Sequence, residues 1–159
     1  MDLDLTPERV RAEYEFVRER PIAPFITEVR RSLGEAFDTE VAPVDDEQYR
    51  TEVDTVFADG DRAVNAAALV AMLRALDVAG DYPGFVVDEF LGRELASTIA
   101  GGQPLALLAE ATFHYADIHH HNDEGGAGLD DLDAALAAGF QTRLPGWSWT
   151  ESESPFAVR

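Results

Sequence analysis

The chain has 159 residues and a formal net charge of −19, because 31 acidic residues face only 12 basic ones, all of them arginine. The missing lysine excludes a Schiff-base nucleophile, a pyridoxal-phosphate anchor and the lysine of a phosphate-binding loop. The missing cysteine excludes a thiol nucleophile, a disulfide, an iron–sulfur cluster and a thiolate zinc site. No basic stripe is present, so the composition disfavours nucleic acid as a partner.

The acidic residues are spread along the whole chain and are not gathered in a tail. This composition resembles that of cytoplasmic proteins from salt-accumulating archaea. The resemblance implies an environment and no function; the alternative is an ordinary acidic protein from a genome that favours arginine. Like charges weaken a compact state in dilute buffer, and salt shortens the screening length to roughly 3 Å at 1 M. We therefore expect a halophilic protein that is compact above about 1 M KCl and loosens at low salt.

The amino terminus predicts a cytoplasmic protein. Residues 1–5 are acidic and lack the basic start and apolar run of a signal peptide. The longest apolar run, Ala66–Leu73, is far shorter than the roughly 20 residues that span a bilayer, so we expect no membrane partner. A chain of this length buries roughly 68–70% of its unfolded surface, which is enough for one core. We expect one domain over residues 1–159.

Cap and breaker residues divide the first third of the chain into helices, along which apolar residues recur at helical spacing. Thr6, followed by proline and glutamate, is typical of a helix start, and Pro21 ends that helix. Pro24 opens a second helix. Asp45 then predicts the start of a third, with Gln48 in the position that completes a capping box.

The same signals predict four more helices, over residues 62–78, 85–100, 104–122 and 130–138. The first of these is apolar nearly all round, which indicates a central position, and its polar residues Asn65 and Arg74 then need partners. Gly139 is expected to end the last helix. Residues 140–159 are not periodic and predict an irregular C-terminal strap. The fold class is therefore all-α, a single-domain array of about six to seven short helices.

The helix predicted over residues 104–122 carries all four histidines. Glu110, His114, Asp117 and His121 fall on one stripe about 60° wide at 100° per residue. Such side chains suit zinc, nickel, iron or manganese. His114 and His121 lie about 10.5 Å apart along the axis, so only neighbouring pairs on the stripe can chelate one ion. Further ligands must come from another helix, where the candidate carboxylates are Asp88, Glu89 and Glu94.

The alternative for this helix is that its polar stripe is a wetted edge and that the protein holds no cofactor. The core stripe would then be Leu107, Ala111, Tyr115 and Ile118. Histidines in a last turn are favoured by the helix dipole without any ligand. The sequence also lacks the Glu-x-x-His spacing of di-iron bundles and the His-Glu-x-x-His motif of metalloproteases.

Two tryptophans, Trp147 and Trp149, lie on the same side of an extended segment near the C-terminus. One interpretation is a strap whose indoles fill grooves between helices, since exposed tryptophans are a liability in a monomer. The other is a partner-binding peptide, because tryptophan is enriched in interface hot spots.

No motif for nucleophilic catalysis is present, since none of the five serines lies in a Gly-x-Ser-x-Gly elbow. We therefore expect a non-enzymatic binding or accessory protein of a halophilic cytoplasm. It would act through protein–protein contacts in a helical groove, with another protein or with further copies of itself. The alternative function is a metal-binding protein or metal-dependent hydrolase that uses the histidine-bearing helix. The second and fifth helices are each expected to turn a phenylalanine inward, namely Phe37 and Phe90.

Overall fold

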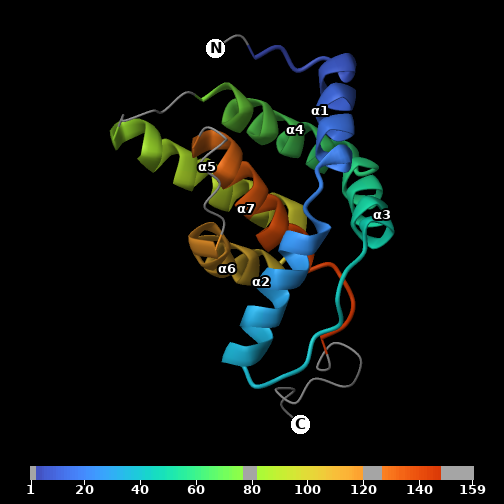
Figure 1. Ribbon diagram of the computed structural model, residues 1–159. Helices are drawn as coiled ribbons and strands as arrows, with labels where there is room; N and C mark the ends of the chain where they lie inside the picture. The colour runs from blue at the N-terminus through green and yellow to red at the C-terminus, as the bar shows by residue number, and fades with distance from the viewer. Residues whose placement is uncertain (1–2, 77–81, 120–126, 148–159) are drawn as a thin grey trace.

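A computed structural model describes residues 3–76, 82–119 and 127–147, with backbone alone for 82–86, 119 and 127–129 (Figure 1). This part of the chain is all-α, as the sequence predicts, and its only β pairing is an isolated bridge between Val41 and Trp147. The helices are Pro7–Glu19 (α1), Ala23–Ala36 (α2), Asp46–Phe57 (α3), Gly60–Ala75 (α4), Tyr82–Ala100 (α5), Leu105–His119 (α6) and Ala127–Gln141 (α7).

Local sequence signals place the starts of α1 and α3 where they were predicted. The Thr6 hydroxyl accepts a hydrogen bond from the Arg9 amide at 3.1 Å. The predicted capping box is present at α3. The backbone N–H of Gln48 donates to the Asp45 carboxylate at 2.8 Å, and the backbone N–H of Asp45 donates to the Gln48 side-chain oxygen at 3.0 Å. Each cap satisfies amides that the first turn leaves open and contributes about 0.5–2 kcal/mol.

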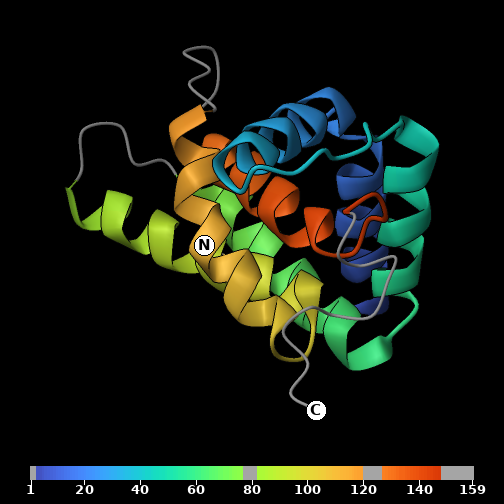
Figure 2. The ribbon, with the colours of Figure 1, turned by 90° about the horizontal axis from the view of Figure 1, so that it is seen from below.

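The helix at the centre of the fold is α7. Every residue from 132 to 140 is buried, and α7 packs against each helix from α2 to α6 (Figures 1 and 2). The helix continues through Gly139 to Gln141, so the prediction that Gly139 ends it is wrong. A Cβ at Gly139 would lie 2.9 Å from the Ile99 Cβ and 3.0 Å from the Ala96 carbonyl oxygen. The glycine therefore allows α7 and α5 to approach closely.

Replacing Gly139 with alanine is expected to destabilise the fold, although glycine to alanine inside a helix usually gains about 1 kcal/mol. The new methyl group meets a backbone oxygen of α5, so the two helices must separate, at a cost of about 1–3 kcal/mol. Urea unfolding measures the change. Gly60→Ala is the control, because an added Cβ there has no atom within 4 Å. Equal stability of the two variants would show that the approach at Gly139 is not tight.

The buried face of α6 lies on the opposite side from the predicted one. The residues that are buried are Ala106, Ala109, Thr112, Phe113 and Ala116. Leu107, Ala111 and Ile118, which were expected to face inward, are exposed. Small residues decide this orientation because they allow close helix packing. A Cβ at Gly92 of α5 would lie 2.5 Å from the ring of Phe113, so this ring packs where α5 has no side chain.

Two further predictions of burial were also wrong, because Phe37 and Phe90 are exposed. Asn65, which was expected to need a partner, is exposed as well. Phe37 is the C-cap residue of α2 and lies just beyond its last turn. The fourth helix contacts α1, α3, α5 and α7 but leaves one side open, and Asn65 lies there. Arg74 of the same helix pairs with Glu13 at 2.9 Å, as expected for a polar residue that needs a carboxylate.

Two arginines are embedded in the fold with different partners. Arg20 donates from Nε and Nη2 to the two carboxylate oxygens of Asp133, at 3.0 and 2.7 Å. Arg30 is 0% exposed and donates from Nη2 to the Pro145 carbonyl at 2.6 Å, while its Nε and Nη1 have no acceptor within the described residues. Burial lowers the pKa of Arg30 to about 10. The first arginine is neutralised by a carboxylate and the second is held by a neutral carbonyl.

Candidate functional site

The predicted histidine–carboxylate stripe of α6 is only partly described. Glu110 and Asp117 are half-buried and His114 is exposed, whereas His121 lies outside the described residues. The Nδ1 atom of His114 is 3.9 Å from a carboxylate oxygen of Glu89 on α5. Across the ranges that the structure describes, no group of three or more histidine or acidic side chains is arranged to hold a metal ion. The stripe as a metal site stays a prediction.

The structure instead brings together carboxylates from three helices: Asp88 of α5, Asp117 of α6 and Asp131 of α7. Asp88 is 0% exposed, and neither of its oxygens has a hydrogen-bond donor among the described residues. Hydrogen bonding with Asp117 raises the pKa of Asp131, because two carboxyl groups can form such a bond only when one of them is protonated. The start of α5, the end of α6 and the start of α7 lie on the same side of the molecule (Figures 1 and 2).

Burial and mutual repulsion shift the proton affinity of this cluster. Burial raises the pKa of Asp88 to about 6, and the nearby charge of Asp117 adds to the shift. The pKa of Asp131 is raised to about 8. Burial is the largest cause, the hydrogen bond to Asp117 is the next, and the charges of Asp117, Asp88 and Glu89 add to it. At neutral pH the cluster therefore retains a proton, and neighbouring carboxylates of this kind are a frequent feature of functional sites.

One sequence signal could have identified Asp88 as buried. It lies four, seven and eleven residues before Gly92, Leu95 and Ile99, which form the buried face of α5. A carboxylate in register with an apolar stripe needs an explanation. No comparable signal marks Asp131, because it is one of three aspartates within four residues of the sequence.

A groove of about 550 Å³ lies between α4 and α5. Its walls are largely apolar, with polar groups at intervals: Asn65, Ala68, Leu69, Met72, Phe90, Leu91, Glu94 and Thr98. Phe90 is 64% exposed, which is unusual for so large an apolar side chain. The groove is therefore an apolar surface that the described part of the chain leaves uncovered.

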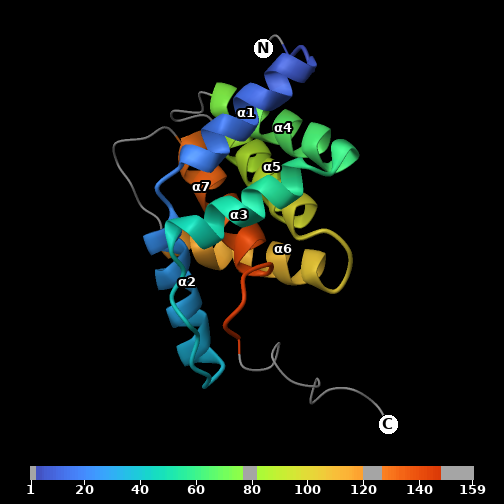
Figure 3. The ribbon, with the colours of Figure 1, turned by 90° about the vertical axis from the view of Figure 1, so that its right-hand side faces the viewer.

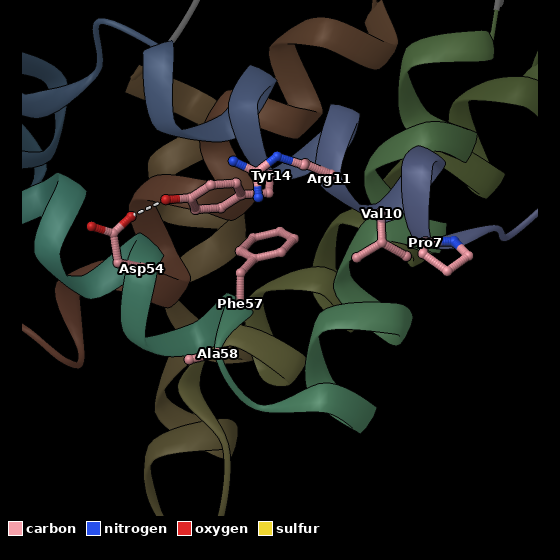
Figure 4. Close-up of a pocket in the computed structure, with 7 residues that line it drawn as sticks. All are labelled: Pro7, Val10, Arg11, Tyr14, Asp54, Phe57 and Ala58. Atoms are coloured by element: carbon pink, nitrogen blue, oxygen red, sulfur yellow. Dashed lines mark hydrogen bonds between the residues drawn. The ribbon is translucent and has the colours of Figure 1, made fainter.

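A second cleft, of about 510 Å³, lies between α1 and α3 (Figure 4). The Tyr14 hydroxyl donates to Asp54 at 2.5 Å, and Arg18 donates to the same carboxylate at 2.9 Å. The hydrogen bond to Asp54 raises the pKa of Tyr14. The Tyr14 ring lies 5.4 Å from that of Phe57, seen beside it in Figure 4. These contacts join α1 to α3, and Figure 3 shows both helices along one side of the molecule.

Comparison with known families places the chain. The model of a domain of unknown function, DUF7984, matches residues 3–159. The chain belongs to this family. Neither the curated proteins nor the solved structures that were compared contain a match. None of the helices in the described ranges of this DUF7984 member is long and apolar enough to cross a membrane.

Of the two tryptophans predicted to bind a partner, Trp149 lies outside the described residues and Trp147 is 5% exposed. The indole of Trp147 donates to Gln141 at 3.2 Å and lies 5.5 Å from the Arg30 guanidinium. Gly146, with a φ of +113°, turns the chain so that its carbonyl accepts from the Ala42 amide. Trp147 in this conformation belongs to the hydrophobic core.

Proposed function

We propose that this chain is a non-enzymatic binding protein that holds an apolar segment of another protein in the groove between α4 and α5. The observation that supports this function is the exposure of Phe90 on a wall shared with Leu69 and Met72. Exposed aromatic side chains beside a groove are typical anchors of protein interfaces. An amphipathic helix is the natural occupant, because such helices insert residues at i, i+3, i+4 and i+7 into apolar grooves.

The charge of the chain defines the partner more closely. The net charge of −19 gives two copies no electrostatic complementarity, which favours a different protein over a homo-oligomer. Glu94 lies at the groove, so the expected segment carries arginine or lysine beside its apolar residues. In the molar salt of the proposed halophilic cytoplasm, screening limits the contribution of these charges. The apolar contact then supplies most of the affinity, and the charges determine how the bound segment is oriented in the groove.

Replacement of Phe90 by serine is expected to abolish partner capture without loss of folding. Tagged protein would be used to capture partners from an extract of its source cells. The buffer would contain about 1 M KCl, because we expect the fold to loosen at low salt. The wild-type chain is expected to retain one dominant protein, and Phe90→Ser to reduce its recovery at least about tenfold, as for an interface hot spot. Thermal unfolding checks that the variant is folded.

Phe37 provides a matched control, because it is equally exposed at 67% but lies at the end of α2, away from the groove. Phe37→Ser is expected to retain the partner. Equal loss of the partner in both variants would indicate that any exposed apolar side chain captures it. Retention of the partner in both variants would exclude the groove as its binding site. Light scattering adds a further outcome: if Phe90→Ser converts a wild-type dimer to a monomer, the occupant is a second copy and the proposed foreign partner is wrong.

A further inference from the structure

A pocket of about 440 Å³ between α1 and α4 has more positive than negative groups in its lining. The lining residues are Arg9, Ala12, Glu13, Ala71, Arg74 and Ala75. Arg9 and Arg74 both donate to Glu13, at 3.0 and 2.9 Å, so two cations share one anion. The chain as a whole carries 31 acidic residues against 12 basic ones, and this pocket is an exception to that balance. In molar salt the screening length is roughly 3 Å, so a ligand responds mainly to the groups that it touches.

The two guanidinium groups are held in place by contacts within the fold. The Glu13 side chain is 3% exposed, and each of its oxygens accepts from a different arginine, Oε1 from Arg9 and Oε2 from Arg74. The central carbon of the Arg74 guanidinium also lies 3.7 Å from the centre of the Phe16 ring, in a cation–π contact. These contacts fix the direction of both side chains, so less conformational entropy is lost when they bind a ligand.

Each arginine keeps donor groups that Glu13 does not use. A guanidinium carries several N–H donors in a planar fork, and Glu13 occupies the Nε of Arg9 and the Nη1 of Arg74. No second acceptor for either arginine lies within the described residues. Their side chains are 37% and 40% exposed, so the remaining donors are open to the pocket and to solvent. The buried acid therefore fixes two arginines whose outer edges stay accessible.

We propose that this pocket binds a small organic carboxylate. The forked N–H donors of a guanidinium match the two oxygens of a carboxylate. The methyl groups of Ala12, Ala71 and Ala75 offer the apolar body of the ligand a surface, which an inorganic anion would not use. The volume lies in the range of about 300–1,000 Å³ that is usual for small-molecule sites. The pocket shares no lining residue with the α4–α5 groove, so it is independent of the proposed function.

Titration of the full chain with benzoate, followed by nuclear magnetic resonance, tests the proposal. Benzoate joins a carboxylate to an apolar ring, and about 1 M KCl in every sample screens weak surface binding. We expect saturable shifts of the Nε–H signals of Arg9 and Arg74 and of the Ala12 methyl signal. Arg9→Gln removes one fork and Ala12→Leu fills the pocket from an exposed position, so each is expected to weaken binding at least about tenfold. Benzamide, which lacks the charge, is expected not to bind.

Arg11→Gln is the matched control, because Arg11 also forms an i,i+4 pair on α1, with Glu15, but lines the α1–α3 cleft instead. It is expected to bind benzoate like the wild type. Absence of saturable shifts in the wild type would overturn the proposal, and so would binding of inorganic phosphate without binding of benzoate. Equal affinity in the wild type, Arg9→Gln and Ala12→Leu would assign benzoate to another surface. Melting curves check that the variants are folded, and Ala12→Leu leaves both arginines on Glu13, which separates a lost site from a lost ion pair.

Discussion

Replacing Arg20 with methionine is expected to cost about 3–5 kcal/mol, whereas the same replacement at Arg30 is expected to cost less than about 1 kcal/mol. Removal of Arg20 leaves the Asp133 carboxylate, 6% exposed, without its bidentate partner. Removal of Arg30 instead takes away a buried cation that faces a neutral carbonyl, and methionine fills similar space without a charge. Arg30 is fully buried and the Arg20 side chain is 23% exposed, so the more deeply buried arginine is expected to be the cheaper one to replace because its partner is uncharged.

Urea unfolding of the two variants in about 1 M KCl measures this difference. Arg11→Met serves as a surface control, because Arg11 forms an exposed pair with Glu15 at 3.4 Å and such pairs contribute at most about 1 kcal/mol. A cost at Arg30 that matches the cost at Arg20 would mean that a strong acceptor for Arg30 exists outside the described residues. A small cost at Arg20 would mean that Asp133 is readily solvated.

Raising the pH from about 5 to about 9 in metal-free buffer is expected to lower the melting temperature by at least about 5 °C, since 1 kcal/mol shifts it about 2–4 °C in a chain of this size. The pKa values of Asp88 and Asp131 are about 6 and about 8 in the folded chain, above the ordinary value of 3.8. The folded chain therefore binds more protons than the unfolded chain between these limits. The contribution of these two groups to the free energy of unfolding is complete below about pH 4, and it is lost as the pH rises through their folded pKa values.

Asp131→Asn provides the control for this pH dependence, because it removes the group with the larger shift. Its melting temperature is expected to vary less over the same pH range. Molar KCl in every sample limits the contribution of general repulsion among the 31 acidic residues. A melting temperature that stays constant or rises with pH would contradict the assignment.

The caps of α1 and α3 could be predicted from the sequence because they are local. Thr6 and Asp45 lie within three residues of the amides that they satisfy, so the sequence alone contains both partners. The helical spacing of apolar residues likewise predicts an all-α chain without any knowledge of the neighbours. The pairing of Arg74 with a carboxylate could be expected in kind, but its partner Glu13 is 61 residues away and could not be named.

The sequence by itself determined that the chain is helical and where α1 and α3 are capped, whereas the tertiary structure decided which face of each helix is buried. In α6 apolar residues occur on two sides, and the buried side is the one that carries three alanines and Phe113, whose ring meets Gly92 of α5. That rotation, together with the burial of Asp88, brings three carboxylates into one cluster. Periodicity measures only the spacing within one helix, while close packing depends on the shape of its neighbours. The fold class could therefore be predicted from local patterns, and the candidate site arises from contacts between distant segments.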